Sequence, residues 1–450
     1  MLGRKVSFRV LIVCVALCGL GALAFGNIVR VAAEGHRTYG LVGDVALELA
    51  SIPKNFREGM ALVLDGGTKD LVAGTDRFGT DRGFTFNTPT GAGYDGEYLL
   101  LSRYDADLRR SVVELIDMAR NQKIHTWTPD FEAINAQSNL QSNLVDLERD
   151  RTPERYRIMH PLLLPDGDIV FQDQAPLIRT GPCGEIRWTL DGVFHHSNEF
   201  NSNGGFWVEA FLEPQTIEQV SKTFKEDAIV HVSEDGEILF QKSVAQLLIE
   251  NGLIRHIYGQ DFYSDDPTHM NDVQEALTDT EYWKAGDLFL SLRNISAIVQ
   301  YRPSTNEVIW IKQGPWINQH DVDILDESRI VVFNNNRLNY QWKDGVDGVN
   351  SVMIYDFATD TVTSPYQAGM ERHDVRTISE GRSEIYPNGD VFLEESNYGR
   401  LLRLDPNGNI VWQYINRADT GRVYRMNWSR VLPRDLAEAA INSLEDVDCS

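Results

Sequence analysis

The sequence predicts an all-β chain, a six-bladed β-propeller that follows one N-terminal transmembrane anchor. Three observations lead to this prediction: an apolar run near the N-terminus, a strand-and-turn theme that recurs along the chain, and a scarcity of helical patterns. The 450 residues are 42% hydrophobic and 10% aromatic, so the chain can build a large packed core.

The N-terminal apolar run reads "VLIVCVALCGLGALAFGNIV" and follows the basic residues Arg4, Lys5 and Arg9. Its length of about twenty residues is enough to cross the hydrocarbon core of a bilayer as a helix. The basic flank should stay in the cytoplasm. We therefore expect one pass through the cell inner membrane, with the propeller facing the periplasm or the cell exterior. A cleaved signal peptide is the alternative, although its apolar region is ordinarily only about 7–15 residues long.

The strand-and-turn theme recurs in six copies at a spacing of roughly 35 to 75 residues. The copies open with "YDGEYLLLSRY", "HPLLLPDG", "HHSNEF", "HMNDV", "QHDVDIL" and "SEIYPNG". Within each copy, short apolar runs are separated by D-G, N-G or similar turns, which are hairpin signals. Repeats of about four short strands at this scale are typical of a β-propeller, and six copies predict six blades.

Four segments follow from this pattern: an anchor or signal segment (1–30), an N-terminal segment (31–92), the propeller (93–430) and a C-terminal tail (431–450). Residues 31–92 are mixed in character and show no clear periodicity. Helical patterns are limited to "VAQLLIEN" around Ala245 and "RDLAEAAINSL" near the C-terminus. The polar stretch 131–151 is compatible with a loop or a surface helix.

The net charge of −24 and the pI near 4.8 argue against nucleic acid as a partner, because phosphate binding needs a basic face. An anionic substrate would have to be held by a local cationic pocket. Two of the four cysteines lie in the apolar run, which leaves Cys183 and Cys449 for the exported part. These two could pair in an oxidising compartment, but the sequence leaves the question open.

Four histidines, His160, His196, His269 and His320, each open a copy just before its first strand. The innermost strands of a propeller line its central channel, so equivalent positions of different blades converge. The last copy has Ser383 in this place, so the fold itself does not require a histidine. One histidine before a strand is ordinarily a capping or core residue. Four of the ten histidines at one repeat position favour a shared functional site.

A cation accompanies these histidines. Arg293 follows the apolar strand "LFLSL". A permanent charge at such a place either pairs with a buried carboxylate or receives an anionic ligand.

The motifs "HHSNEF", "HMNDV" followed by "LSLRN", and "NQHDVDIL" followed by "VVFNNN" resemble those of the bacterial arylsulfate sulfotransferase family. They occur in that family's order, and the resemblance covers residues 93–415. It implies a six-bladed propeller enzyme without a cofactor. Such an enzyme moves a sulfuryl group from an aryl sulfate ester to a phenolic acceptor through a sulfated histidine. Its partners would be these two small molecules, and its oligomeric state stays open.

The resemblance also implies roles for individual residues. His320 matches the histidine that becomes sulfated, whereas His269 and Arg293 match the residues that hold the sulfuryl oxygens. Either His195 or His196 matches the remaining pocket histidine, and "HSN" at His196 parallels "HMN" at His269.

The expected catalytic set is therefore His320, His269, Arg293 and His196. His195, His160 and Asn271 are expected to contact the substrate, and no metal is required. The sequence departs from the family's usual pattern where "FNNN" replaces an acidic-asparagine-glycine ending.

Two other functions compete with this interpretation. Three or four converging histidines could hold zinc or manganese, as in a metal-dependent lyase, although Arg293 would repel a divalent ion. A membrane-tethered propeller could also be a binding scaffold without activity. Apolar residues would then be tolerated at the positions that open the blades.

Overall fold

The computed structural model describes residues 8–33, 37–65, 71–73, 76–87, 96–217, 220, 224–259, 264–339 and 344–449. The chain forms two compact units, residues 1–69 and 70–450. The predicted start of the propeller at Gly93 lies outside the described residues. The predicted boundaries after residues 30 and 430 stay predictions.

The first unit consists of α1 (Phe8–Ala33), the 3₁₀ turn η1 (Arg37–Tyr39) and α2 (Gly40–Asp65). Residues 12–33 of α1 have a mean hydropathy of 2.3 and none of them is buried, as in a membrane anchor or a signal sequence. The sequence analysis found no periodicity after residue 30, yet α2 is a helix of 26 residues. Its first half places exposed apolar side chains three or four residues apart, which is a helical spacing: Leu41, Val42, Val45, Leu49 and Ile52.

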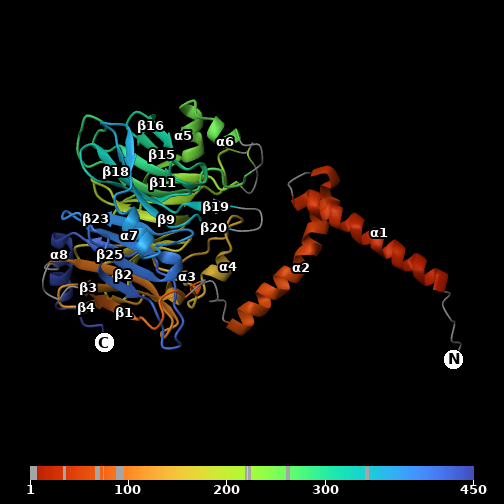
Figure 1. The fold of residues 1–450 in the computed structure, drawn as a ribbon, viewed down its shortest axis with the longest axis horizontal. Coiled ribbons are helices and arrows are strands. Elements are labelled where there is room, and N and C mark those ends of the chain that lie inside the picture. The colour runs from red at the N-terminus through yellow and green to blue at the C-terminus, as the bar shows by residue number, and fades with distance from the viewer. Residues whose placement is uncertain are drawn as a thin grey trace. The chain divides into compact units, whose positions relative to one another are not determined.

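The second unit is a six-bladed β-propeller, as predicted (Figure 1). Each blade is an antiparallel sheet of four strands, and the sixth carries a fifth strand. The first strands of blades 2 to 6 contact one another in succession around the central channel.

The strands follow the order of the six sequence copies. Blades 1 to 3 contain β27 (Arg430–Leu432), β2 (Tyr98–Asp105), β3 (Arg110–Asp117) and β4 (Gln122–Trp127); β5 (Met159–Leu163), β6 (Ile169–Gln172), β7 (Leu177–Thr180) and β8 (Ile186–Leu190); and β9 (Val193–Phe200), β10 (Phe206–Phe211), β11 (Asp227–Val232) and β12 (Ile238–Ser243).

Blades 4 to 6 contain β13 (Met270–Glu275), β14 (Leu288–Leu292), β15 (Ala297–Arg302) and β16 (Glu307–Gln313); β17 (His320–Ile324), β18 (Arg329–Asn334), β21 (Ser351–Asp356) and β22 (Thr361–Thr363); and β23 (Arg382–Ile385), β24 (Val391–Glu395), β25 (Arg400–Leu404), β26 (Ile410–Ile415) and β1 (Gly83–Phe86). The hairpin β19 (Arg337–Asn339) and β20 (Asp344–Val346) projects from blade 5.

Both ends of this unit close the ring. The C-terminal strand β27 pairs with β2 in blade 1, with Tyr98 opposite Leu432. The N-terminal strand β1 pairs with β26 in blade 6, with Gly83 opposite Ile415. In Figure 1 the orange strands β1 to β4 therefore lie beside the blue strand β25. Blades 1 and 6, unlike the other blades, are built from residues far apart in the sequence.

Helices are short and few in the described part of this unit. They are α3 (Phe131–Ala136), α4 (Leu147–Asp150), α5 (Val244–Glu250), α6 (Arg255–Tyr258), α7 (Gln367–Arg372) and α8 (Arg434–Leu444), with the 3₁₀ turns η3 (Arg293–Ile295) and η4 (Ser396–Tyr398). The helices predicted around Ala245 and near the C-terminus are confirmed as α5 and α8. The stretch 131–151 contains two short helices joined by a loop.

The hydrophobic core is divided into wedges between adjacent blades. One wedge joins blades 3 and 4 through Trp207, Met270 and Leu290. Equivalent clusters fill the other five interfaces, including that between blades 1 and 6, where Leu101 meets Trp412. Because each blade buries both faces against its neighbours, the inner strands are held rigidly around the channel.

Cys183 and Cys449 form a disulfide bond across 266 residues of sequence, which answers the question that the sequence left open. Cys183 lies in the turn between β7 and β8 of blade 2, and Cys449 lies beyond α8. The bond thus ties to blade 2 the chain end that also provides β27.

We expect the double variant Cys183→Ser, Cys449→Ser to lose about 2–5 kcal/mol of unfolding free energy, because the bond restricts a long loop of the unfolded chain. Chemical denaturation of the wild type and the variant measures this loss. Replacing the exposed free cysteines Cys14 and Cys18 is the matched control and should change nothing. Identical denaturation midpoints with and without a reductant would contradict the expectation.

Candidate active site

One residue at the inner edge of each blade adopts a left-handed backbone conformation. These residues are His160 (φ 44°), His196 (φ 55°), His269 (φ 49°), Asp321 (φ 57°), Glu380 (φ 59°) and Trp428 (φ 67°). Such a conformation is uncommon for residues other than glycine and bends the start of the inner strand. Three of the four predicted histidines occupy this position, whereas His320 lies one residue before it.

Three of the predicted histidines form one cluster. The ring centroid of His196 lies 4.9 Å from that of His269 and 6.2 Å from that of His320. They come from three successive blades, on β9, just before β13 and at the start of β17. The convergence expected from the repeat positions is therefore present for these three side chains.

His320 is held at both ring nitrogens. Nδ1 lies 2.7 Å from Oδ1 of Asn335, and the backbone N–H of Glu380 donates to Nε2 at 3.1 Å. Because the Asn335 amide nitrogen donates to the carbonyls of Thr377 and Glu380, its Oδ1 must accept the Nδ1 proton. The ring is thus a neutral Nδ1–H tautomer whose lone pair is on Nε2. Burial and the nearby Arg293 guanidinium hold the pKa of His320 well below its ordinary value.

His269 is oriented by a carboxylate. Its Nδ1 donates to Oδ2 of Asp266 at 2.6 Å, so its proton is fixed on that nitrogen and Nε2 carries the lone pair. Burial lowers the pKa of His269, although Asp266 acts in the opposite direction.

Arg293 is a buried cation beside these two imidazoles. It is 9% exposed and begins η3, directly after β14. Its backbone N–H donates to the carbonyl of His269 at 3.1 Å, and Nη1 donates to Oδ1 of Asn294 at 3.1 Å. The guanidinium lowers the pKa of both His320 and His269, so it lies within electrostatic reach of both rings. An anion bound between them would meet this charge in a poorly hydrated site.

The sequence could not say which of His195 and His196 faces the other histidines. The structure places His196 beside His269 and His320, whereas His195 is buried against Phe211, with ring centroids 4.0 Å apart. The two Nδ1 atoms are 2.8 Å from each other. Burial lowers the pKa of His195 to about 3.

His160 and Asn271 have contacts of a structural kind. His160 is fully buried and its ring packs on Trp428 of the neighbouring blade 1. Asn271 is also fully buried and donates from Nδ2 to the carbonyl of Gln319 at 2.9 Å, so it fixes the backbone just before His320. Their predicted contact with substrate stays a prediction.

The sequence analysis missed three groups that orient these histidines: the Asn335 side chain, the Asp266 carboxylate and the Glu380 backbone N–H. Asn335 lies in the sequence "FNNN", which differs from the family's usual ending. This difference was the one sign in the sequence that could have pointed to Asn335. The Glu380 N–H depends on Gly381, whose φ is +93°. A Cβ at Gly381 would lie 2.8 Å from the ring of Phe333 and 2.9 Å from the carbonyl of Glu394, so this turn requires glycine.

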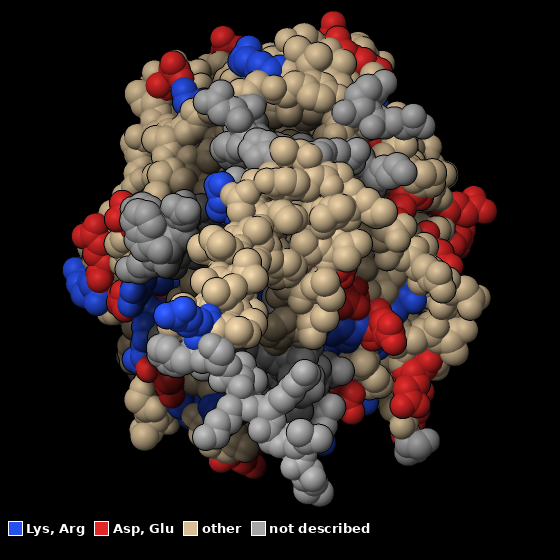
Figure 2. All heavy atoms as spheres, turned by 90° about the vertical axis from the view of Figure 1, so that its right-hand side faces the viewer, with Lys and Arg blue, Asp and Glu red and all other residues tan. Residues whose placement is uncertain are grey.

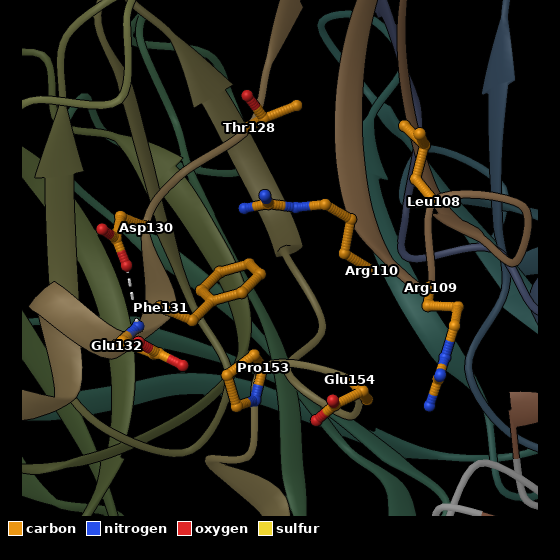
Figure 3. Close-up of a pocket in the computed structure, with 9 residues that line it drawn as sticks. All are labelled: Leu108, Arg109, Arg110, Thr128, Asp130, Phe131, Glu132, Pro153 and Glu154. Carbon is orange, nitrogen blue, oxygen red and sulfur yellow. Dashed lines mark hydrogen bonds between the residues drawn. The ribbon is translucent and has the colours of Figure 1, made fainter.

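A groove of about 470 Å³ lies elsewhere, on blade 1, between the β2–β3 turn, the start of α3 and residues 153–154 (Figure 3). Arg110 extends across it above the ring of Phe131, with the guanidinium carbon 5.5 Å from the ring centroid. Asp130 caps α3 by accepting the Glu132 N–H. No predicted site residue lines this groove.

Charged side chains of both signs are mixed on the surface that Figure 2 shows. Red Asp and Glu side chains lie among blue Lys and Arg side chains there. Neither sign of charge forms a broad patch in this view.

Comparisons with solved structures show the fold alone. A protein of unknown function from Bacteroides caccae is 11% identical, with a TM-score of 0.45, over 73% of this chain and 97% of that chain. Virginiamycin B lyase from Staphylococcus aureus is 11% identical, with a TM-score of 0.37, over 74% and 88%. The Pan2 WD40 domain of Neurospora crassa is 9% identical, with a TM-score of 0.38, over 76% and 93%. These similarities carry no argument about activity.

No curated protein matches the sequence. The model of one protein family, described as Arylsulfotransferase (ASST), matches residues 160–417, which is more than half of the chain. The match includes every histidine of the cluster and blades 2 to 6, apart from Met159 at the start of β5 and the strand β1 of blade 6. The chain therefore belongs to the arylsulfotransferase family.

Proposed function

We propose that this aryl sulfotransferase moves a sulfuryl group from an aryl sulfate ester to a phenolic acceptor, with His320 as the transient carrier. Family membership supports sulfuryl transfer between small molecules in general. The carrier and the acceptor class are inferred from the site.

The observation that carries the proposal is the state of His320. Asn335 fixes the proton on Nδ1, and burial keeps the ring neutral, so Nε2 holds a lone pair. A neutral imidazole is a competent nucleophile. Its N–S bond to a sulfuryl group is also readily broken by a second nucleophile, as a carrier requires.

In the first half-reaction, Nε2 of His320 attacks sulfur. The N–S bond forms as the S–O bond to the aryl group breaks, and the phenolate leaves with the electron pair. In the structure the Glu380 N–H occupies the Nε2 lone pair at 3.1 Å, so the donor must displace this hydrogen bond. Once freed, the N–H can donate to a sulfuryl oxygen, beside the Arg293 guanidinium.

In the second half-reaction, the acceptor hydroxyl attacks the sulfuryl group and the N–S bond breaks. A base must take the hydroxyl proton. His269 suits this task because Asp266 fixes its Nδ1 proton and leaves Nε2 free to accept. His196, 4.9 Å from His269 between ring centroids, provides a further polar group for the sulfuryl oxygens.

We further propose that α1 anchors the chain in the cell inner membrane with the propeller on the periplasmic or outer side. The apolar length of α1 supports an anchor. The Cys183–Cys449 bond supports an oxidising compartment, because disulfides are rare in the cytosol.

We expect His320→Ala to abolish both aryl sulfate cleavage and covalent labelling, because no other group then accepts the sulfuryl. Peptide mass spectrometry of protein trapped with an aryl sulfate at mildly alkaline pH should show one added sulfuryl group on the peptide that contains His320. The peripheral variant His373→Ala, whose ring bonds to the carbonyl of Gly408, is the control and should label normally. Turnover that persists in His320→Ala would place the chemistry elsewhere.

We expect His269→Ala or Arg293→Ala to slow transfer by roughly 100- to 1,000-fold, by analogy with the loss of a group that stabilises transition-state charge. Labelling of His320 should remain detectable at long incubation times. Single-turnover kinetics with an aryl sulfate measures the effect. A loss of less than threefold in both variants would remove these residues from the reaction.

We expect Asn335→Ala to reduce cleavage roughly 10- to 1,000-fold, because the His320 proton would no longer be fixed on Nδ1. Asn336→Gly is the matched control, because this neighbouring side chain donates to the carbonyl of Asp347 and not to the ring of His320. The kcat for aryl sulfate cleavage should fall in the first variant alone. Equal activities in the two variants would show that Asn335 does not set the tautomer.

The rate of the first half-reaction should change little between pH 7.5 and pH 5.5. The pKa of His320 is lowered, so the ring stays neutral as the pH falls through the ordinary histidine value near 6.5. Single-turnover release of phenolate, measured across this range, should vary by less than about threefold. A tenfold fall with an apparent pKa near 6.5 would indicate an imidazole of ordinary basicity.

A further inference from the structure

A second cluster of buried groups lies behind His196, on the strands of blade 3. The Nδ1 atoms of His195 and His196 are 2.8 Å apart, and Oε2 of Glu209 lies 3.6 Å from Nδ1 of His195. One ligand atom from each of the three residues falls within 4.8 Å of the others. Two imidazoles and one carboxylate thus converge on one point.

The backbone of β9 brings the two histidines to the same side. Successive side chains of a regular strand point to opposite faces. The pairing of β9 with β10 is interrupted here, since Asn198 pairs with Val208 and His195 pairs with Glu209. The left-handed conformation of His196 lies within this bulge and turns its ring toward that of His195.

Glu209 is fully buried, and its carboxylate has few hydrogen-bond donors around it. The Ser197 hydroxyl reaches Oε1 only at 3.5 Å, and Oε2 has no hydrogen-bond donor among the described residues. A buried carboxylate without a cation either costs several kcal/mol or avoids this cost by taking up a proton. A divalent cation at the convergence point would keep the carboxylate ionised and pair with it.

The carboxylate of Asp227 lies next to Nε2 of His195, the ring nitrogen on the side away from His196. Its Oδ1 lies 3.5 Å from Nε2 of His195 and has no other partner among the described residues. The Thr268 hydroxyl and the Met270 N–H hold its second oxygen. A carboxylate behind a histidine, on the nitrogen that faces away from the ligand atom, is the usual companion of a metal-bound imidazole.

We propose that His195, His196 and Glu209 bind a divalent first-row transition metal ion, with Zn²⁺ as the ion that suits these donors. The ligands are Nδ1 of His195, Nδ1 of His196 and Oε2 of Glu209. Two imidazole nitrogens and one carboxylate oxygen form a known three-residue zinc set that leaves a position for water. This site goes beyond sulfuryl transfer and does not depend on it.

Such an ion would also define the state of His196. An imidazole that coordinates through Nδ1 carries its proton on Nε2, and its ring orientation is fixed. His196 would then be a permanent N–H donor next to His269 and His320. A proton shared between the two Nδ1 atoms explains their 2.8 Å separation equally well, but it leaves Glu209 without a cation. The two arrangements differ in metal content.

The test uses full-length protein in detergent, stripped with a chelator and then titrated with ZnCl₂. Elemental analysis after desalting should give close to one Zn²⁺ per chain in the wild type. His195→Asn and Glu209→Gln should bind at least tenfold more weakly. His269→Asn and His320→Asn are the controls. These two histidines lie close to His196 but are not proposed ligands, so both variants should retain the ion.

X-ray absorption of zinc-loaded wild-type protein should show two imidazole nitrogens and one or two oxygens. This measurement decides the matter even if a variant fails to fold. Wild-type uptake no greater than that of Glu209→Gln would overturn the site. If His195→Asn and His320→Asn lost equal amounts of bound Zn²⁺, or if the absorption spectrum showed three imidazoles, the ion would belong to the cluster of His196, His269 and His320 instead. Metal content is measured without turnover, so either result is separate from the fate of the sulfuryl-transfer proposal.

Discussion

A buried carboxylate in one blade accepts backbone N–H groups from the start of the next inner strand, and this contact recurs around the channel. The donor and acceptor pairs are Met270 to Asp227 (3.1 Å), Val322 to Asp272 (2.7 Å), Ser383 to Asp321 (2.8 Å) and Ser429 to Glu394 (2.6 Å). A hydrogen bond contributes about 0.5–1.5 kcal/mol to stability, and leaving a buried N–H without a partner costs about 1–3 kcal/mol. The first two donors follow His269 and His320 within two residues. The contact between blades therefore also sets the height of the site histidines.

The same burial determines the charge state of the channel. It raises the pKa of Asp272 to about 7 and lowers that of His320, so both shifts favour the uncharged form. In a chain with a net charge of −24, the surroundings of the histidine cluster are thus less anionic than the composition suggests. Arg293 keeps its charge because a guanidinium is not deprotonated in proteins. Its field acts on a bound anion with little screening.

The repeat analysis could predict the blades because each copy carries its own turns and strands. It could also predict that His196, His269 and His320 converge, since inner strands of a propeller share one channel. It could not predict that β27 completes blade 1, because this pairing joins residues 98–100 to residues 430–432. A three-residue strand carries too little pattern to be recognised alone. The helix α2 was missed for a different reason: its apolar spacing was overlooked in a mixed composition.

The finer arrangement of the site was beyond the sequence for physical reasons. The histidines share a repeat position, yet the left-handed residue of blade 5 is Asp321 and not His320. His195 and His320 therefore both directly precede the left-handed residue of their blade, and His196 is the residue that lies beside His269 and His320. Backbone conformation of this kind follows from the bulges of folded strands. Residues such as Glu209 and Asp227 gain meaning only once those bulges are known.

The turn 377–381 connects the orientation of His320 with access to it. Asn335 receives the Nδ1 proton of His320 and, through its amide nitrogen, holds the carbonyls of Thr377 and Glu380. The Glu380 carboxylate is tied to Arg157 at 3.0 Å on blade 2.

His320 is 1% exposed, and the Glu380 N–H covers its nucleophilic nitrogen. A donor can reach Nε2 only if this turn shifts. Such a shift would disturb the ion pair between the Glu380 carboxylate and Arg157. Because the Asn335 amide also donates to the Glu380 carbonyl, movement of Glu380 removes one of the two bonds that direct Oδ1 toward Nδ1 of His320, and the bond to the Thr377 carbonyl has to hold the tautomer. Access to His320 and the orientation of its ring are therefore coupled through Asn335.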